Sequence, residues 1–380
     1  LATLNQIIAQ LKADGTLADM KRRWFEHVSG PYEELSITLP KKGQVLRVGM
    51  SGTEEPFGFV DKNGRLTGHD GELSRILAAR LHRPVEFVTM KFMALIPALE
   101  AGKIDLIVSD MTATAERWKA VDFTQPYFVD SQVMLVKNKS DDTIASLPFV
   151  GSVINSFRIN ILHENRYLLI LDGLKTTVII SIVATIMGTL LGGLVCYMRM
   201  SKKFALRLPA KIYISIMRGT PVLVLLMLIF YVVFASVDIN PIIVSIIAFG
   251  LNFAAYAAEI FRTGIDGVDK GQSEAGIAMG FSKVKTFIYI VLPQTIRRIL
   301  PVYKGEFITL VKMTSIVGYV AVQDLTKASD IIRSRTFDAF FPLVMIAILY
   351  FLISWVLLQS LEYVERITDP KYKRARVRNV

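Results

Sequence analysis

The sequence predicts an α/β lobe followed by an α-helical membrane domain of about five transmembrane helices. Of the 380 residues, 52% are hydrophobic and only 20% are charged, which is too apolar for an ordinary soluble protein. The apolar residues are concentrated from about residue 168 onward, whereas residues 1 to about 150 alternate short helix and strand patterns. These observations place the lobe first and the membrane domain second.

The N-terminal part combines a helical start with an α/β pattern. Residues 3–25 predict one or two helices with a break at Asp14-Gly15, and residues 26–44 form a linker. The elements expected beyond it are strands at 44–50, 85–90, 104–110 and 132–138, helices at 70–81 and 95–103, and a hairpin at 57–68 that turns at Asn63-Gly64. Asp70 is placed to cap the first of these helices. Such alternation with short connections indicates a sheet with helices packed against it.

Long apolar runs predict the membrane spans. The first has 26 residues, which at 1.5 Å each reach about 39 Å and exceed a hydrocarbon core of roughly 30 Å. The expected spans are 173–198, 221–237, 241–260, a weaker one at 306–322, and 341–361. The weaker span lies in a stretch, 287–322, that prolines and charges interrupt. Because a charge in a lipid-facing span costs about 2.5–3.5 kcal/mol, this stretch should be covered by a partner or lie partly at the interface.

Basic residues predict the orientation. The loop 199–218 carries six Lys or Arg and no acidic residue, and the tail after residue 366 is also basic, so both should be cytoplasmic. An odd number of spans then places residues 1–150 outside a bacterial cytoplasmic membrane. The chain opens at Leu1 inside a helical pattern, from which we expect a fragment or processed form that lacks its start.

A polar, glycine-punctuated loop separates two apolar segments at residues 271–294, GQSEAGIAMGFSKVKTFIYIVLPQ. Gly271 and Gly280 bracket a helix-sized piece, and Glu274 lies near its start, where the helix dipole favours an acid. Ala275 and Gly276 give this piece a low-relief surface. These residues alone leave an ordinary amphipathic connector as one interpretation.

The spacing of Glu274, Ala275, Gly276, Gly280 and the later Ile-x-Leu-Pro resembles the EAA loop of ABC import permeases. Residues of about 165–365 resemble the polar amino-acid subfamily of these permeases. The resemblance implies that Glu274, Ala275, Gly276 and Gly280 form a coupling helix that docks on a separate ATPase. The family has alanine where Gly276 stands, and the lost methyl is expected to loosen this helix slightly.

The resemblance also implies the partners. No Walker A pattern occurs, so the chain is expected not to be an enzyme, to need no cofactor and to leave ATP to the partner subunit. We expect an ATPase dimer, a second permease subunit that is a second copy of this chain, a polar amino-acid substrate and membrane lipid. No nucleic-acid partner is expected. Cys196 rules out an intramolecular disulfide because it is the only cysteine, and the four histidines share no metal-ligand spacing.

Residues 45–139 resemble the first lobe of periplasmic polar amino-acid-binding proteins, on VGMSGTEEPFGFVDKNGRLTGHDGELSRIL and TATAERWKAVDF. Residues 1–30 resemble the C-terminal helix of the same family. The resemblance implies that Arg117 pairs with a substrate α-carboxylate, that Thr112 donates a hydrogen bond beside it, and that Phe92 forms an aromatic wall. The residues expected to bind substrate are Ser51, Glu54, Phe92, Asp110, Thr112 and Arg117.

Glu54 and Asp110 depart from the family's usual residues. They either favour a cationic amino acid or are solvated edge residues. A larger departure is the missing second lobe, which we expect upstream in the full-length protein. The expected domains are 1–30 and 45–139 for the binding domain, 140–167 as a polar connector, 168–365 as the permease domain and 366–380 as a cytoplasmic tail.

An alternative function is an amino-acid-gated ion channel of the glutamate-receptor type. Residues 314–321, TSIVGYVA, echo a potassium filter, but Val320 stands where the filter's second glycine should be. A channel also has no use for the EAA spacing. Arg297-Arg298 fit either helix capping and partner contact or binding of a carboxylate or lipid phosphate. Gly188 and Gly192-Gly193 fit either close span packing or a pore lining.

Overall fold

The computed structural model describes residues 1–26, 32, 35–61, 64–130, 149–338 and 340–368. The chain divides into two compact units that interleave along the sequence. The lobe unit comprises residues 1–173, 231–238 and 318–345, and the helical unit comprises 174–230, 239–317 and 346–380. Residues 318–345, which the sequence analysis assigned to the permease domain, therefore pack with the lobe.

Two helices and a π-helical turn begin the lobe unit: α1 Ala2–Ala13, α2 Thr16–Lys21 and η1 Arg22–Glu26. The predicted break is confirmed. Gly15 has a φ of +81°, and the Asp14 carboxylate accepts a hydrogen bond from the Thr16 amide at 3.0 Å. Glycine adopts this left-handed conformation without the penalty that a Cβ brings.

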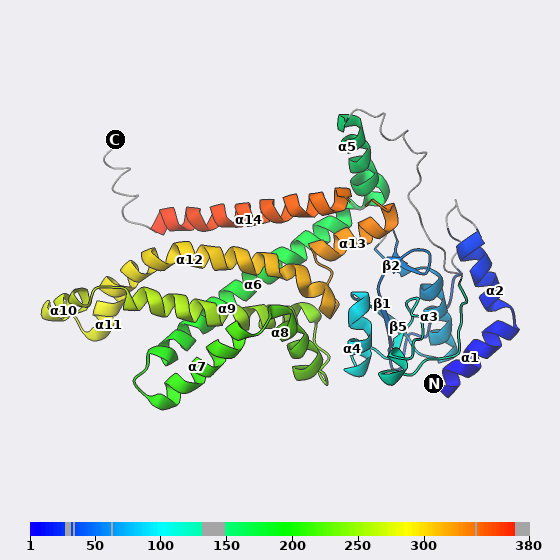
Figure 1. Cartoon of the computed structure of the whole chain (residues 1–380), viewed down its shortest axis with the longest axis horizontal. Helices are drawn as coiled ribbons and strands as arrows, with labels where there is room; N and C mark the ends of the chain where they lie inside the picture. Colours follow the sequence, from blue (N-terminus) through cyan, green and yellow to red (C-terminus); the bar gives the residue numbers. More distant parts are fainter. Residues whose placement is uncertain (27–31, 33–34, 62–63, 131–148, 339, 369–380) are drawn as a thin grey trace. The chain divides into compact units, whose positions relative to one another are not determined.

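A parallel sheet follows, with strand order β5-β1-β6. Its strands are β1 Leu46–Met50, β5 Val85–Thr89 and β6 Leu106–Ile107. Helices α3 His69–Arg80 and α4 Leu95–Glu100 lie on opposite sides of these strands (Figure 1). The predicted α/β layering is confirmed, although β6 is shorter than expected. The strand expected at 132–138 lies outside the described residues.

The predicted hairpin is part of a small antiparallel sheet of β2 Thr53–Glu54, β3 Gly58–Val60 and β4 Leu66–Thr67. Gly64 turns the hairpin with a φ of +75°, while Asn63 lies outside the described residues. The expected capping role of Asp70 is wrong. The N-cap of α3 is Gly68, which makes no side-chain cap, and Asp70 lies inside the helix.

The lobe core joins segments that are distant in sequence. Its buried cluster includes Ile8 and Leu11 of α1, Val48 of β1 and Leu73 of α3, and also Ile331. A buried ion pair fixes the first helices to α3. The guanidinium of Arg23 donates to both carboxylate oxygens of Glu72, at 2.6 and 2.9 Å, and the Trp24 indole donates to the same carboxylate at 2.8 Å.

The connector expected at 140–167 is helical where the structure describes it. It contains α5 Phe149–Phe157, a π-helical turn Arg158–Leu162 and a 3₁₀ turn His163–Asn165. Asn160 is buried and donates to the Asp338 carboxylate at 2.9 Å. The expectation of a polar connector is not met over residues 149–165, which are helical and carry exposed apolar side chains such as Ile154 and Leu162. Residues 140–148 lie outside the described part.

The described residues contain three helices long and apolar enough to cross a membrane, or up to five if each of two bent pairs is one span. The three are α6 Tyr167–Met200, α9 Pro241–Asp266 and α14 Phe340–Thr368. The bent pairs are α7 Phe204–Gly219 with Val222–Val233, at 111°, and Lys283–Val320 with α13 Leu325–Thr336, at 59°. The expected total of five is thus the upper bound, and the second span is broken.

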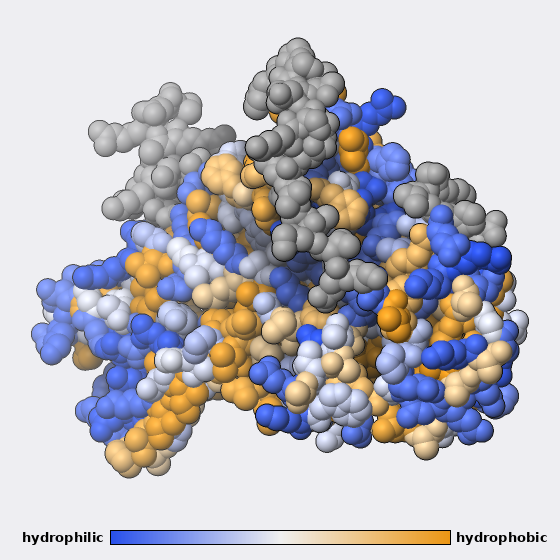
Figure 2. All heavy atoms as spheres, turned by 45° about the vertical axis from the view of Figure 1, so that its right-hand side comes forward, coloured by the Kyte–Doolittle hydropathy of each residue, from blue (hydrophilic) through white to orange (hydrophobic). Residues whose placement is uncertain are grey.

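Small residues bring α6 and α9 close together in the helical unit. A Cβ at Gly192 would lie 2.7 Å from the Ala257 Cβ, and one at Gly188 would lie 2.7 Å from the Gly250 carbonyl oxygen. The packing interpretation is therefore confirmed for Gly188 and Gly192, whereas a Cβ at Gly193 would meet no atom within 4 Å. Apolar side chains such as Leu190 on α6 and Phe351 on α14 remain exposed, and hydrophobic patches are visible on the surface in Figure 2. Exposed apolar helix surface of this kind fits contact with lipid.

Candidate functional site

The predicted substrate residues gather beyond the carboxyl ends of the parallel strands. In open α/β sheets this edge is where ligands bind. Ser51 directly follows β1, and its amide donates to the Ser109 hydroxyl at 3.0 Å. Glu54 ends β2, and Asp110 follows β6 with a positive φ of 43°.

Arg117, Thr112 and Phe92 lie close together. Arg117 begins a 3₁₀ turn, and its Nη1 donates to the Thr112 carbonyl oxygen at 2.8 Å. The same guanidinium lies over the Phe92 ring, 5.4 Å from the centroid. The backbone bond and the ring contact hold the guanidinium in one orientation. Their assignment as substrate-binding residues stays a prediction.

Three acids lie close together at this edge. Burial, together with the charges of the neighbouring Asp110 and Asp70, raises the pKa of Glu54 to about 7. Burial and the charge of Asp70 likewise raise the pKa of Asp110. The sequence analysis missed Asp70 as a member of this cluster. Its buried carboxylate accepts from the Asp110 amide at 2.8 Å and contacts His69 Nδ1 at 3.0 Å.

Helix α13 lies against this edge within the lobe unit. The Lys327 ammonium donates to the carbonyl oxygens of Ser51, at 2.6 Å, and Met90, at 3.3 Å, and only 3% of the residue is exposed. A cavity of about 570 Å³ opens beside it. Of the predicted substrate residues, Glu54 and Phe92 line this cavity, together with residues of α13 such as Asp330 and Arg333.

The loop at 271–294 forms a short helix, α10 Lys270–Ala278, in the helical unit. Its N-cap is Asp269, whose carboxylate accepts from the Gly271 amide at 2.6 Å. Glu274 lies in the second turn, one turn further from the helix start than expected, because the helix begins at Lys270. Gly280, with a φ of +86°, follows the helix.

The surface of α10 is exposed. Glu274 and Ala275 are open to solvent, and so are two large apolar residues, Ile277 at 51% and Met279 at 72%. Figure 1 shows α10 and α11 Lys283–Thr286 beyond the ends of α9 and α12 Leu292–Met313. Exposed apolar residues beside an acid are typical of a surface that binds another protein.

Gly276 is the one residue of α10 that is buried. A Cβ there would lie 2.7 Å from the Thr286 Cγ2 and 2.8 Å from the Ile290 Cδ1. The expectation that Gly276 only loosens the helix therefore omits its packing role. The absent methyl leaves room for α10 to pack against the turns that follow it.

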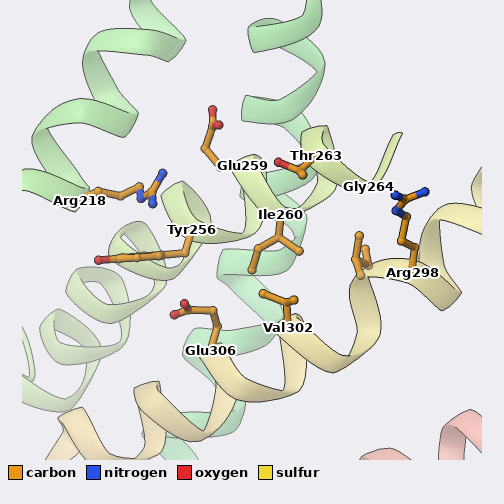
Figure 3. Close-up of a pocket in the computed structure, with 10 residues that line it drawn as sticks. Arg218, Tyr256, Glu259, Ile260, Thr263, Gly264, Arg298, Val302 and Glu306 are labelled. Atoms are coloured by element: carbon orange, nitrogen blue, oxygen red, sulfur yellow. The ribbon is translucent and has the colours of Figure 1, made fainter. Parts of the chain in front are cut away.

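A second cavity, of about 460 Å³, lies in the helical unit (Figure 3). Figure 3 shows Tyr256 between Arg218 and Glu306, and the Arg218 guanidinium lies 5.1 Å from the Tyr256 ring centroid. Arg298 also lines the cavity and donates to the Gly267 carbonyl at the end of α9, which supports the capping interpretation. The sequence analysis did not identify this cavity, because it forms only where α7, α9 and α12 meet.

Comparisons with known proteins relate the chain to solute-binding proteins and to transport permeases. Residues 46–333 match the bacterial extracellular solute-binding proteins, family 3. The chain is 35% identical over 204 residues to the probable amino-acid ABC transporter permease protein YckA of Bacillus subtilis (strain 168), covering 53% of this chain and 88% of that protein. It is 34% identical over 208 residues to the putative glutamine transport system permease protein GlnP of Rickettsia typhi, covering 54% and 94%. An ancestral arginine-binding protein bound to arginine is 51% identical over 22% of this chain and 37% of that one, with a TM-score of 0.22.

Proposed function

Because the chain belongs to the amino-acid ABC transporter permeases and carries part of a family 3 solute-binding domain, we propose that it imports polar amino acids, with a preference for cationic ones. The lobe lies outside the membrane and the C-terminal tail inside. Two permease subunits, both copies of this chain, work with two ATPase subunits. The single observation that carries the coupling part of this proposal is the exposed surface of α10.

Coupling depends on how α10 is held. Its buried Gly276 and its capped start fix the helix to the permease, while Glu274, Ile277 and Met279 face outward. A rigid helix with an exposed acid and apolar residues can dock in a partner groove and pass on its movement. This arrangement supports the assignment of Glu274, Ala275, Gly276 and Gly280 as ATPase-coupling residues.

The preference for a cation follows from the acids of the lobe. Glu54 and Asp110 both have a raised pKa, which means that the site disfavours their negative charges when it is empty. A cationic side chain placed beside them would relieve this repulsion and favour the ionised carboxylates. Arg117, held over Phe92, is positioned to pair with the α-carboxylate of the same ligand.

The cavity of the helical unit supports a route for the substrate. Its lining carries two cationic residues, Arg218 and Arg298, and two anionic residues, Glu259 and Glu306. Tyr256 lies between Arg218 and Glu306 (Figure 3). An amino acid carries charges of both signs. We expect the transported molecule to pass through this cavity between its release from the lobe and its arrival in the cytoplasm.

The test uses the full-length protein with its ATPase, reconstituted in liposomes. ATP hydrolysis and uptake of radiolabelled arginine, lysine, histidine, glutamine and glutamate are measured together. We expect uptake that requires ATP and favours arginine or lysine. Uptake that favours glutamate would contradict the role of Glu54 and Asp110. An amino-acid-triggered ion current without ATP would instead support the channel alternative.

A further inference from the structure

Helix α13 closes over the ligand-binding edge of the lobe, where a binding protein of two lobes has its second lobe. We propose that α13 forms the second wall of the amino-acid site, and that a zwitterionic amino acid binds in the cavity between Phe92 and Arg333. This inference rests on the proposed amino-acid import. It assigns to a helix of the permease sequence a direct contact with the ligand.

The first argument is that α13 belongs to the lobe's own core. Ile331 is 1% exposed and is part of the lobe's buried cluster. Lys327 binds two carbonyl oxygens at the strand ends, and the buried Arg335 lies 3.7 Å from the Glu55 carboxylate. Apolar packing and charged contacts together hold α13 at this edge.

The second argument is the charge pattern of the cavity. The lobe supplies Glu54 and Lys91, and α13 supplies Asp330, Arg333 and Lys327. Lys327 is bound to backbone carbonyls, so each wall offers a ligand one acid and one base. A molecule with a carboxylate and an ammonium on one carbon can pair with both the basic and the acidic side chains. A simple anion would pair only with the bases, and a simple cation only with the acids.

The third argument concerns which groups remain available. Lys327 is committed to backbone carbonyls, but the Arg333 side chain is 43% exposed and contacts Asp330 at 3.1 Å on its own helix. An exposed pair of this kind contributes little stability, so a ligand carboxylate can replace Asp330 at modest cost. Asp330, also 3.5 Å from the Lys91 ammonium, would then face the ligand's ammonium group.

The aromatic lining and the volume fit the same ligand class. Phe92 and Tyr319 line the cavity, and the Lys91 ammonium lies 5.2 Å from the Tyr319 ring centroid. A volume of about 570 Å³ falls in the range of small-molecule sites, roughly 300–1,000 Å³. The cavity can therefore admit a long side chain such as that of arginine.

The experiment compares amino acids with their α-amides, which lack the carboxylate charge. The full chain is purified in lipid nanodiscs without the ATPase, and binding of radiolabelled L-arginine and L-glutamine is competed with argininamide and glutaminamide. For the wild type we expect at least one pair in which the acid binds about tenfold or more tightly than the amide. In Arg333→Gln the acid should bind about tenfold more weakly and the preference over the amide should fall, while the proposed contact of the same carboxylate with Arg117 remains.

Arg80→Gln is the matched control, because Arg80 is a lobe arginine outside the cavity whose contact with Asp14 is long, at 3.8 Å. It should leave both affinities unchanged. Arg117→Gln is the decisive comparison. If Arg117→Gln alone removes the preference for the acid and Arg333→Gln keeps it, the lobe binds the carboxylate without α13 and the inference is overturned.

Failure of this inference is separable from failure of the proposed function. Unchanged binding by Arg333→Gln together with ATP-dependent uptake would overturn the role of α13 and leave the importer intact. Absence of binding by the wild type would also overturn the inference. Loss of uptake with normal acid-specific binding would keep the site and count against the coupling proposal.

Discussion

Helices α10 and α13 are similar in form and opposite in burial. They have 9 and 12 residues, and each is capped by an aspartate, Asp269 for α10 and Asp324 for α13. Yet α10 buries only Gly276, whereas α13 buries six residues, Lys327 and Ile331 among them. A capped short helix can thus be left exposed or become part of a core according to what covers it. The exposed helix is the one that we propose as a partner surface, and each side of the comparison can be tested.

The largest expected effect is on coupling through α10. Glu274→Lys reverses an exposed charge in the surface that we assign to the ATPase, and loss of such a central contact can cost 2 kcal/mol or more, about a thirtyfold change. ATP-driven uptake in liposomes should fall by at least that factor while the melting temperature stays the same. The control is Glu100→Lys, an exposed acid of the lobe. Normal uptake by Glu274→Lys would refute the coupling role.

The next effect is on the stability of the folded protein, and it follows from the burial of Ile331 and the exposure of Ile277. Ile331→Ala in α13 should lower the free energy of unfolding by about 2–5 kcal/mol, because it leaves a cavity in the lobe core. Ile277→Ala in α10 removes the same atoms from an exposed position and should change it by less than about 0.5 kcal/mol. Thermal unfolding of the two purified variants measures the difference. Equal melting temperatures would mean that α13 is not part of the lobe core.

The close packing around Gly276 predicts a smaller loss of stability when this residue is enlarged. Gly276→Ala should destabilise the attachment of α10 by about 1–3 kcal/mol, because the new methyl meets the Thr286 Cγ2. Thr286→Ser removes that methyl group and should restore part of the lost uptake and thermal stability in the double variant. If Gly276→Ala is neutral and the double variant is the less stable, the packing argument is wrong.

The smallest expected effect is a pH dependence of the stability of the lobe, the unit in which α13 is buried. The pKa of Glu54 is raised by burial from 4.5 to about 7, so the folded lobe keeps a proton that the unfolded chain has lost. Stability should therefore fall as the pH rises from about 4.5 to 7 and level off above it. Glu54→Gln should remove this decline and gain about 1–2 kcal/mol at pH 8, a figure reduced for partial exposure. Melting curves from pH 4.5 to 8.5 test this.

The same raised pKa predicts proton-coupled binding. If a cationic amino acid binds beside Glu54, its charge lowers the pKa of the carboxyl group and a proton is released. Arginine affinity should then rise from pH 6 to pH 8 in the wild type and stay flat in Glu54→Gln. Calorimetry in buffers of different ionisation enthalpy measures the released proton, and no release at pH 7 would contradict a contact between the ligand and Glu54.

Local sequence patterns predicted which helices and strands occur, but they predicted the residues at which these elements begin and end less accurately. The break at Asp14-Gly15 and the alternation of strands and helices in the lobe follow from turn residues and apolar periodicity, which act over a few neighbours. The assignment of Asp70 as a cap failed because a cap and an internal acid look alike in sequence. The partner that decides the matter, the Asp110 amide, is forty residues away.

The sequence by itself determined that this chain joins an α/β binding lobe to a helical permease carrying an EAA-type loop, because composition, periodicity and motif spacing are all local properties. Only the tertiary structure decided which surfaces those elements share. The contact of Lys327 with the carbonyls of Ser51 and Met90 joins residues more than two hundred positions apart. The residues beside a lysine in the sequence do not indicate that it is buried, because its burial depends on the packing of a whole helix against another segment.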